Sequence, residues 1–360
     1  MVDDIREIIE AIQPVDGLLQ PQIQQRLDDL TKPKGSLGRL EECAMRMALI
    51  QNTVNPQLTK KRFYVFAADH GVAEEGVSAY PSEITYQMVL NMLDGGAGIN
   101  VLGRHADAEM YVVDVGVAAD FTEAQIQKGL ISRKVMRGSK NMVKEPAMDE
   151  EQMRQAFMTG VEMARRANDE GVQLLGTGEM GIANTTPSTA LLAALLPCSV
   201  EEVTGKGTGL DKDGITHKVS VIKQAMQLHA RVLQERDPFQ ILAAVGGLEI
   251  AAMVGMILAA ASLRMGLVVD GFISSAAALV AYRTCPPVKD YIFFSHLSAE
   301  CGHQVFLDKI EVEPLLDLGL CLGEGTGAAL AMQIIQASMK LYQEMNTFSG
   351  AGIQQISEGV

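Results

Sequence analysis

The sequence predicts an α/β protein built on a doubly wound, largely parallel sheet flanked by helices. Short apolar runs alternate with helix-forming stretches from about residue 62 to residue 330. Apolar runs of this length are typical of parallel strands that are buried on both faces. Since 360 residues exceed the usual single domain, we expect a large α/β domain at 61–337. A small helical domain from the chain termini, at 1–60 and 338–360, would complete it.

The composition restricts the class of protein and its partners. Hydrophobic residues make up 48% of the chain, aromatic residues only 5%, and Trp is absent, which predicts an aliphatic core. The net charge of -14 argues against nucleic acid as a partner. An acidic protein can still bind a phosphorylated small molecule, because backbone N–H groups and one or two lysines suffice locally. The five cysteines lack C-x-x-C spacing, which predicts reduced thiols and a cytoplasmic location.

Nothing in the sequence predicts an association with a membrane. The acidic start of the chain does not resemble a secretory signal. The stretch 241–263 is long enough to span a bilayer, but it contains Glu249 and a pair of glycines, and a carboxylate in lipid is costly. We therefore expect 241–263 to form a helix buried in a large soluble domain.

The N-terminal part reads as helices at 3–12, 21–30 and about 37–51. The sequence Lys-Pro-Lys-Gly-Ser-Leu-Gly at 32–38 is a basic loop that either contacts a ligand or simply connects two helices.

Buried strands are predicted at 63–68, 109–115, 172–175, 267–269 and 291–294. Asp69 and His70 follow the first strand, and Asp114 lies near the end of the second. Open α/β sheets bind ligands at the carboxyl ends of their strands. Asp69 and His70 could equally be a hydrogen-bonded pair that closes the strand. The polar stretch 132–147 is expected to be a surface loop.

The sequence Gly-Thr-Gly occurs at 176–178, 207–209 and 325–327, and each copy lies near a charged residue. Glu324 stands between two glycines, and a helix is expected to begin just after Gly327. Glycines allow a sharp turn and a close approach of a ligand, and the first N–H groups of a helix can point at that ligand. We expect one pocket built from three loops, although each loop alone could be an ordinary turn.

Two other chemistries fit the sequence less well. The pattern G-x-G-x-x-G at 176–181 matches a dinucleotide fingerprint, but 188–196 reads as helix where a second strand should follow. His296, Cys301 and His303 could suggest a metal site, yet no paired carboxylates accompany them, and structural histidines are the commoner interpretation.

Six ordered motifs together resemble one family, the nicotinate-nucleotide:dimethylbenzimidazole phosphoribosyltransferases of cobalamin lower-ligand synthesis. The motifs are Asp-His-Gly-Val-Ala at 69–73, Gly-Gly at 95–96, Gly-Glu-Met-Gly-Ile-Ala-Asn-Thr-Thr at 178–186, Thr-Gly-Lys-Gly-Thr-Gly-Leu-Asp at 204–211, Ser-His-Leu-Ser-Ala-Glu at 295–300 and Leu-Gly-Glu-Gly-Thr-Gly at 322–327. The resemblance extends from Lys32 to about Ala337. Ala183 stands where many members have Gly, and Cys301 replaces an expected Pro.

The resemblance implies transfer of the 5-phosphoribosyl group of nicotinate mononucleotide to 5,6-dimethylbenzimidazole, with inversion, giving α-ribazole 5'-phosphate and nicotinate. It assigns Glu324 as the catalytic base in a large catalytic domain. Expected contacts to the donor phosphate and ribose are Gly178, Glu179, Gly205, Gly207, Thr208, Lys218 and Ser298. Expected contacts to the benzimidazole are Gln87, Met88, Met180 and Leu322. The substrates are small molecules, no cofactor or metal is needed, and a homodimer is expected.

The residues themselves fit this chemistry. An azole must lose its N–H proton as its other nitrogen attacks, and one positioned carboxylate can accept it. Glu179 could stabilise an oxocarbenium-like carbon or hold the ribose hydroxyls. Two other hypotheses remain open: a phosphosugar-binding regulatory protein without turnover, and a nucleotide-dependent oxidoreductase.

Overall fold

The computed structural model describes residues 3–353, and its centre is a six-stranded sheet in which every pairing is parallel. The strand order is β3-β2-β1-β4-β5-β6. From β1 in the middle, the chain adds β2 and β3 on one side and then β4, β5 and β6 on the other, so the predicted doubly wound sheet is confirmed. The strands are β1 Lys61–Ala68, β2 Glu109–Gly116, β3 Ile131–Ser132, β4 Leu174–Met180, β5 Gly266–Val269 and β6 Ile292–Phe294.

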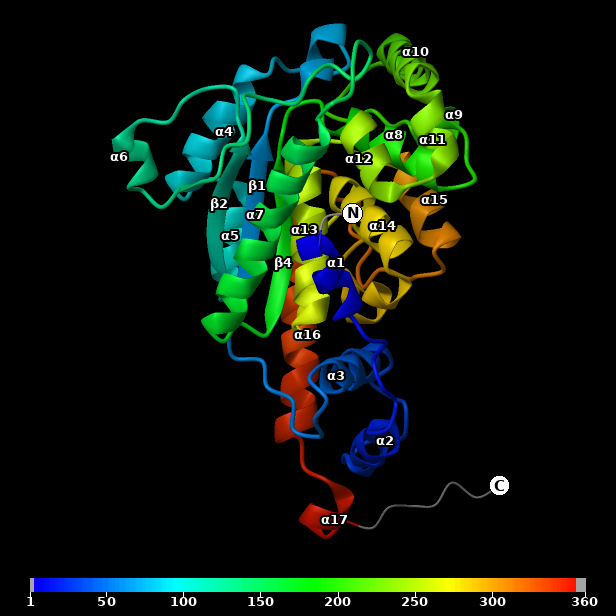
Figure 1. Ribbon diagram of the computed structural model, residues 1–360. Coiled ribbons are helices and arrows are strands. Elements are labelled where there is room, and N and C mark those ends of the chain that lie inside the picture. Colours follow the sequence, from blue (N-terminus) through cyan, green and yellow to red (C-terminus); the bar gives the residue numbers. More distant parts are fainter. Residues whose placement is uncertain (1–2, 354–360) are drawn as a thin grey trace.

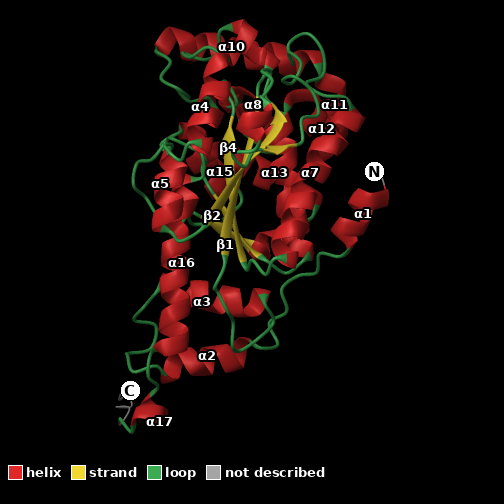
Figure 2. Ribbon diagram, turned by 90° about the vertical axis from the view of Figure 1, so that its left-hand side faces the viewer, coloured by secondary structure: helices red, strands yellow, loops and turns green. Residues whose placement is uncertain are grey.

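Helices cover both faces of the sheet (Figures 1 and 2). On one face α13 (Leu248–Ser262) packs against four strands, with α7 (Glu150–Asp169) and α14 (Phe272–Thr284) beside it. On the other face lie α4 (Glu83–Leu93), α5 (Gly98–His105) and the first part of α16 (Thr326–Glu344). This arrangement explains why every residue of β1 is buried.

Glycines let α7 and α13 touch backbone to backbone. A Cβ added at Gly160 of α7 would lie 1.8 Å from the carbonyl oxygen of Ala252, and one at Gly255 of α13 would lie 1.9 Å from that of Phe157. A larger residue at either position would force the helices apart.

The structure contains several further helices. Their bounds are α1 Asp3–Glu10, α2 Gln20–Asp29, α3 Arg39–Ile50, α6 Glu123–Ile126, α8 Thr185–Leu195, α9 Val200–Val203, α10 Lys212–Leu228, α11 Ala230–Glu235, α12 Pro238–Val245, α15 Cys301–Lys309 and α17 Phe348–Ala351, with 3-10 turns at Gly71–Glu75 and Pro286–Tyr291.

The two chain ends meet away from the sheet. In Figure 1 the red helix α16 runs from the sheet down to α3 and α2. A small apolar cluster joins these three helices, formed by Ile23, Leu27, Leu30, Ala44, Ala48 and Tyr342. Helix α1 packs against α13 instead, and its isoleucines belong to the main core. The division into domains at 1–60, 61–337 and 338–360 remains a prediction, and its residues 1–2 and 354–360 lie outside the described residues.

Several local predictions differ from the structure. The stretch 241–263 forms two helices, α12 and α13, because Gly246 and Gly247 interrupt it. The segment 132–147 is not simply a surface loop: Ser139 pairs with His70 beyond β1, and Met142 and Ala147 are buried. Helix α16 begins at Thr326, directly after Gly325 rather than after Gly327.

The first Gly-Thr-Gly copy is not a turn, because β4 continues through it to Met180. A Cβ at Gly176 would lie 2.2 Å from the ring of Phe63, so this glycine serves packing inside the sheet. The dinucleotide interpretation of 176–181 therefore lacks the turn that a pyrophosphate requires. Within residues 3–353, no helix is long and apolar enough to cross a bilayer.

Candidate active site

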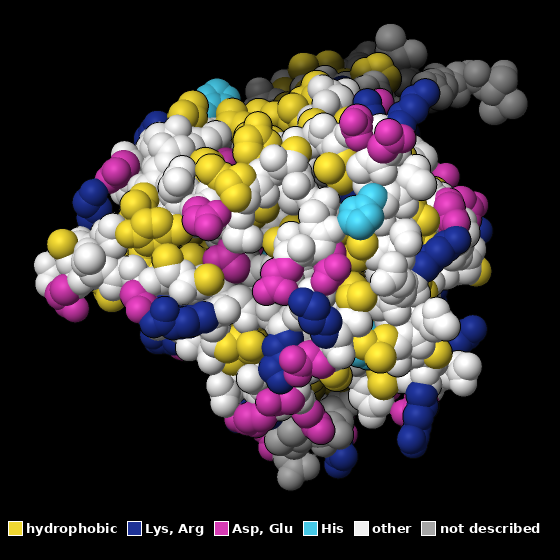
Figure 3. Space-filling model, turned by 90° about the horizontal axis from the view of Figure 1, so that it is seen from above, with side chains coloured by type: hydrophobic (Ala, Val, Ile, Leu, Met, Phe, Trp, Pro, Cys, Tyr) yellow, Lys and Arg dark blue, Asp and Glu magenta, His cyan; other side chains and the backbone are white. Residues whose placement is uncertain are grey.

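Three carboxylates lie at the carboxyl ends of neighbouring strands. Asp69 follows β1, Glu179 is near the end of β4 and Asp270 follows β5, and all three are buried. Parallel strands end at the same edge of a sheet, so their terminal residues gather there. Seen from above, this end of the molecule presents hydrophobic side chains interspersed with acidic and basic ones (Figure 3).

Glu324 reaches this edge on a turn of unusual backbone. Gly323, Glu324 and Gly325 have φ angles of 80°, 62° and 101°, so three successive residues are left-handed. This conformation is rare and costly for a residue other than glycine, and it is typical of functional sites. A Cβ at Gly178 of β4 would lie 2.5 Å from the carbonyl oxygen of Glu324. The glycine therefore lets the turn lie directly on the strand.

The Glu324 carboxylate is buried, and a backbone N–H group orients it. Its Oε2 accepts a hydrogen bond from the backbone N–H of Ile99, the second residue of α5, at 3.2 Å, and the side chain is buried. Burial raises the pKa of Glu324, the Ile99 N–H opposes this effect, and the negative charge of Asp270 adds to it. A carboxylate whose pKa is raised toward neutrality is a suitable general base.

Glu179 contacts the same turn. Its Oε1 accepts the backbone N–H of Glu324 at 3.2 Å, and its Oε2 accepts a hydrogen bond from the side-chain amide of Asn184. Burial raises the pKa of Glu179 to about 8, opposed by Asn184 and reinforced by Asp270. The neighbouring carboxyl groups thus occupy different environments, an arrangement that often separates two catalytic roles.

The residues expected to contact the benzimidazole come from α4, from β4 and from the segment before Glu324. Leu322 is 61% exposed and lies with Glu324 against Gly98, at 2.9 Å from where a Cβ of that glycine would be. Met88 of α4 and Met180 of β4 are half-buried against the main core. Gln87 is exposed on α4, and its side chain makes no hydrogen bond within residues 3–353. Leu322 and Glu324 thus meet at the same glycine of α5.

A buried lysine marks the second part of the site. Lys218 of α10 is completely buried, and its Nζ donates to Thr185 Oγ1 at 2.6 Å. Gly207 lies directly beside it, since a Cβ there would be 3.3 Å from the same Nζ. Burial lowers the pKa of Lys218 to about 8, although the charge of Glu300 opposes the shift. A buried ammonium beside a glycine-rich loop is suited to binding an anion.

The same loop meets the segment after β6. A Cβ at Gly205 would lie 1.8 Å from Glu300 Oε2, an atom that is buried and has no hydrogen-bond partner within the described part of the chain. Burial raises the pKa of Glu300, and Lys218 opposes this shift. Ser298 Oγ accepts the backbone N–H of Glu300 at 3.3 Å. Gly205, Gly207, Lys218 and Ser298 are therefore linked through Glu300.

Thr208 lies at the outside of the loop. Its Oγ1 is 3.2 Å from Ser78 Oγ, in the segment before α4. The structure therefore places Thr208 beside residues that follow β1, while Gly205 and Gly207 face Lys218 and Glu300.

The two histidines near this loop have internal partners. His303 Nδ1 accepts the backbone N–H of Ser298 at 2.8 Å, and its Nε2 lies 2.9 Å from Ser275 Oγ. Burial lowers the pKa of His303 to about 3, so the ring is neutral and orients the Ser298 segment. His296 Nε2 lies 3.9 Å from Asp270 Oδ1.

Asp69 and His70 do not bond to each other. Asp69 Oδ2 accepts the backbone N–H of Ala118 at 2.8 Å, and His70 Nε2 lies 2.8 Å from Glu249 Oε1 of α13. Burial opposes the charge of His70, but the Glu249 carboxylate raises its pKa above the usual value. In the 32–38 loop, Lys32 forms a buried ion pair with Glu41 at 2.8 Å.

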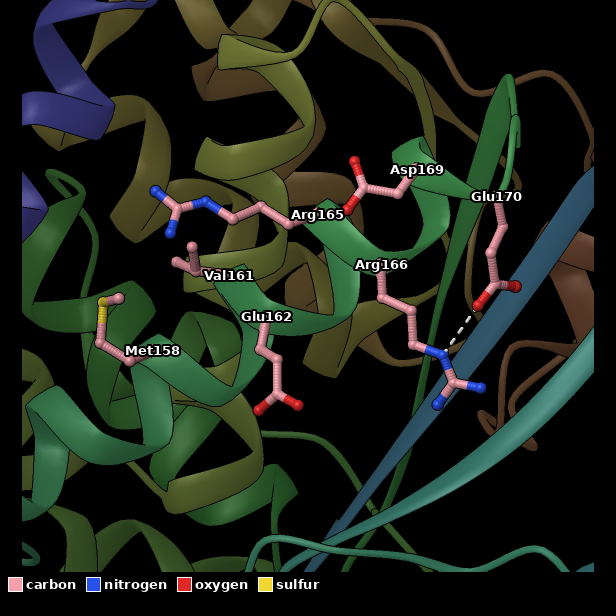
Figure 4. A pocket seen from close by; sticks show the side chains of 7 residues that line it. All are labelled: Met158, Val161, Glu162, Arg165, Arg166, Asp169 and Glu170. Atoms are coloured by element: carbon pink, nitrogen blue, oxygen red, sulfur yellow. Dashed lines mark hydrogen bonds and ion pairs between the residues drawn. The ribbon is translucent and has the colours of Figure 1, made fainter.

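Two surface hollows lie elsewhere. One, with a volume of about 470 Å³, runs along α7 and is lined by side chains between Met158 and Glu170. Within it, Arg166 forms an ion pair with Glu170 (Figure 4). Another of about 630 Å³ lies between α3 and the segment around β6. Neither is lined by a residue expected to bind the substrates.

Sequence reasoning missed four residues of this site: Asn184, Thr185, Asp270 and Glu300. Asp270 had a usable signal, since it follows an apolar run just as Asp69 does. Asn184, Thr185 and Glu300 stand inside motifs that were recognised, but only the folded chain shows which polar groups they meet.

Comparisons with known proteins agree on one family. A family model described as Phosphoribosyltransferase matches residues 12–353. The nicotinate-nucleotide–dimethylbenzimidazole phosphoribosyltransferase of Pelodictyon phaeoclathratiforme is 54% identical over 99% of both chains. That of Chlorobium chlorochromatii is 55% identical over the full length of both. The crystal structure of the Thermus thermophilus enzyme of the same name has 44% identity and a TM-score of 0.88, covering 94% of this chain and 99% of that one.

Proposed function

The chain belongs to the nicotinate-nucleotide–dimethylbenzimidazole phosphoribosyltransferase family, and from this premise we propose its reaction in detail. It transfers the 5-phosphoribosyl group of nicotinate mononucleotide to 5,6-dimethylbenzimidazole, giving α-ribazole 5'-phosphate and nicotinate. Relatives above 50% identity over the full length carry this name, and the chain is accordingly a phosphoribosyltransferase of cobalamin lower-ligand synthesis.

The observation that carries the proposal is Glu324, a buried carboxylate with a raised pKa on a left-handed turn. In the proposed step, one azole nitrogen attacks C1' of the ribose on the face opposite the nicotinate. The C1'–N bond to nicotinate breaks, and its electron pair neutralises the pyridinium ring. Glu324 accepts the proton from the other azole nitrogen. Attack from the opposite face inverts C1' and gives the α anomer.

Glu179 acts on the ribose in this proposal. Its pKa of about 8 means that it is mainly protonated near neutral pH in the free enzyme. A neutral carboxyl group can both donate to and accept from the ribose hydroxyls, which would hold C1' in front of Glu324. The proximity of Glu179 Oε1 to the Glu324 backbone supports a shared orienting role.

The donor phosphate is assigned to Lys218, the glycine loop at 205–209 and Ser298. Lys218 supplies a cation, and the loop supplies backbone N–H groups. Gly178 keeps the Glu324 turn close to this site. The benzimidazole is assigned to an apolar slot between Leu322, Met180 and Met88, with Gln87 at its rim. Leu322 supports this slot because it lies next to Glu324.

Release of nicotinate tests the reaction directly. With the purified protein, we expect nicotinate to form from nicotinate mononucleotide only when dimethylbenzimidazole is also present. Formation of nicotinate without dimethylbenzimidazole would indicate a hydrolase. Binding of both compounds without any release would indicate a regulatory binding protein instead.

The proposal includes a homodimer in the cytoplasm. Sedimentation equilibrium of the full chain should give twice the mass of 38.7 kDa at assay concentrations. A mass equal to one chain throughout that concentration range would contradict the dimer without affecting the proposed chemistry.

A further inference from the structure

Asp270 holds the backbone on the C-terminal side of Glu324. Its Oδ2 accepts the N–H of Gly325 at 3.1 Å, and its Oδ1 accepts the N–H of Ala328 at 2.9 Å. One side chain at the end of β5 thus ties down both the last residue of the left-handed turn and the first turn of α16.

The turn needs such a restraint. Its three left-handed residues include Glu324, for which this conformation is unfavourable. The first N–H groups of a helix also lack partners within the helix, and an anion satisfies them best. Without an acceptor at Asp270, the turn could relax and carry the Glu324 carboxylate away from its position.

Asp270 is itself fixed by its neighbours. Its backbone N–H donates to Thr177 Oγ1 of β4 at 3.0 Å, and its carbonyl oxygen accepts from Ser295 Oγ at 2.8 Å. Its side chain is almost fully buried, with His296 at 3.9 Å. The position of Asp270 is therefore determined by β4, β5 and the segment after β6.

We infer that Asp270 is a positioning residue for the transfer reaction, locking the turn that aims Glu324 at the proton of the azole. The inference rests on the proposed role of Glu324. It also explains why the residue is Asp, since Asn has one acceptor oxygen and would turn its NH₂ group toward one of the two backbone N–H groups.

The charge of Asp270 has a second effect that a test can use. Burial is the main cause that raises the pKa of Glu324, and the Asp270 carboxylate raises it further. The other titratable groups around this edge are Glu179 of β4 and His296 after β6, with His70 and Glu249 beyond Glu179. Loss of the negative charge at Asp270 lowers the pKa of Glu324. The acid limb of the kcat profile should then move to lower pH.

The test compares Asp270→Asn with Asp237→Asn. Asp237 accepts the N–H groups of Phe239 and Gln240 at the start of α12, so it is a matched Asp cap that has no contact with Glu324. We expect Asp270→Asn to lower kcat roughly tenfold to a hundredfold, the scale of a misplaced catalytic group, with little change in the donor Kd. Asp237→Asn should lower Tm and leave both kcat and the acid limb unchanged.

Gly325→Ala provides an independent variant that leaves Asp270 intact. A Cβ there would lie 3.0 Å from the Thr177 carbonyl oxygen, and φ is 101°, so the turn must shift. It should reproduce the loss of kcat with donor binding retained. If Asp270→Asn does not fold, Gly325→Ala still tests whether kcat depends on the position of the turn, and a normal kcat would overturn the positioning role.

Glu324→Gln, measured in parallel, separates the possible failures. Normal kcat in Glu324→Gln would overturn the proposed base. The positioning role alone would be overturned if Glu324→Gln loses kcat while Asp270→Asn keeps a normal kcat. It would also be overturned if Asp237→Asn loses as much kcat as Asp270→Asn.

Discussion

The two parts of the site are built in different ways. The acidic part, formed by Glu179, Asp270 and Glu324, is held mainly by backbone N–H groups from the 323–325 turn, α5 and α16. The lysine part, formed by Gly205, Gly207, Lys218, Ser298 and Glu300, depends on loops and on side-chain contacts such as Lys218 with Thr185.

The two parts also differ in how many of their buried carboxyl oxygens have hydrogen-bond partners. Both oxygens of Glu179 and both oxygens of Asp270 have partners, whereas Glu300 Oε2 is buried without one inside residues 3–353. Carboxyl groups bonded at both oxygens are preorganised, while a buried acceptor without a partner retains capacity for a further donor. Changes in the acidic part should therefore alter rate, and changes in the lysine part should alter donor binding.

The largest expected effect is that of Glu324→Gln on the rate. Gln preserves the shape of the side chain but cannot accept the azole proton, so kcat should fall roughly a hundredfold or more. Single-turnover kinetics with both substrates saturating would measure it. Glu162→Gln is a matched control, because Glu162 is exposed and pairs with Arg133 at the surface. A kcat near that of wild type in Glu324→Gln would contradict the expectation that the acidic part controls the rate.

Lys218→Ala should have the next largest effect, and on binding rather than rate. Loss of a charge-assisted hydrogen bond costs about 1.5–3 kcal/mol. The donor Kd should accordingly rise roughly tenfold to a hundredfold, while the affinity for uncharged dimethylbenzimidazole stays nearly constant. Calorimetric titration of each substrate provides both values.

Lys223→Ala is the control for this variant, since Lys223 lies on the same helix α10 but is exposed and pairs with Glu201. Equal weakening of donor and benzimidazole by Lys218→Ala would mean that the lysine supports the whole pocket. The phosphate would then have to be held elsewhere, for example at the 325–327 turn.

The smallest effect expected is a difference in pH dependence between rate and binding. The pKa of Glu324 is raised by burial, so kcat should fall with decreasing pH at values above the usual range for Glu, about 4.3. Lys218, with its pKa lowered to about 8, loses its charge as pH rises through that value. One unit above this pKa about a tenth of the lysines remain charged, so the donor Kd should rise by up to about tenfold.

Titrations from about pH 6 to about pH 9 with wild type and Lys218→Ala would test this difference. The rise in Kd with pH should disappear in Lys218→Ala. A rise that persists unchanged in that variant would show that another group titrates in the donor site.

Much of the sheet and several residues of the site could be predicted from the sequence, because strand ends are visible as apolar runs that stop at a polar residue. Asp69 was recognised on such grounds, Glu324 from the glycines that flank it, and the role of Lys218 from the family resemblance. The parallel sheet was predictable for the same reason, since its strands are buried on both faces.

The remainder depends on tertiary contacts that local patterns do not contain. The run Gly-Thr-Gly at 176–178 resembles a turn, yet Gly176 makes room for Phe63 and Gly178 for the Glu324 carbonyl within a continuous strand. Segment 132–147 is polar, but Ser139 is covered because it pairs beyond β1. Asp270 reads as the flank of a four-residue strand, and its role emerges only when α16 is placed against it.

We propose that this chain joins ribose phosphate to dimethylbenzimidazole with inversion at C1'. The most direct measurement is mass spectrometry of the product formed from nicotinate mononucleotide and dimethylbenzimidazole, followed by nuclear magnetic resonance of its anomeric proton. We expect a product with the mass of ribazole 5'-phosphate and the α configuration. A β product would contradict inversion at C1', and ribose 5-phosphate in place of any ribazole would contradict the transfer itself.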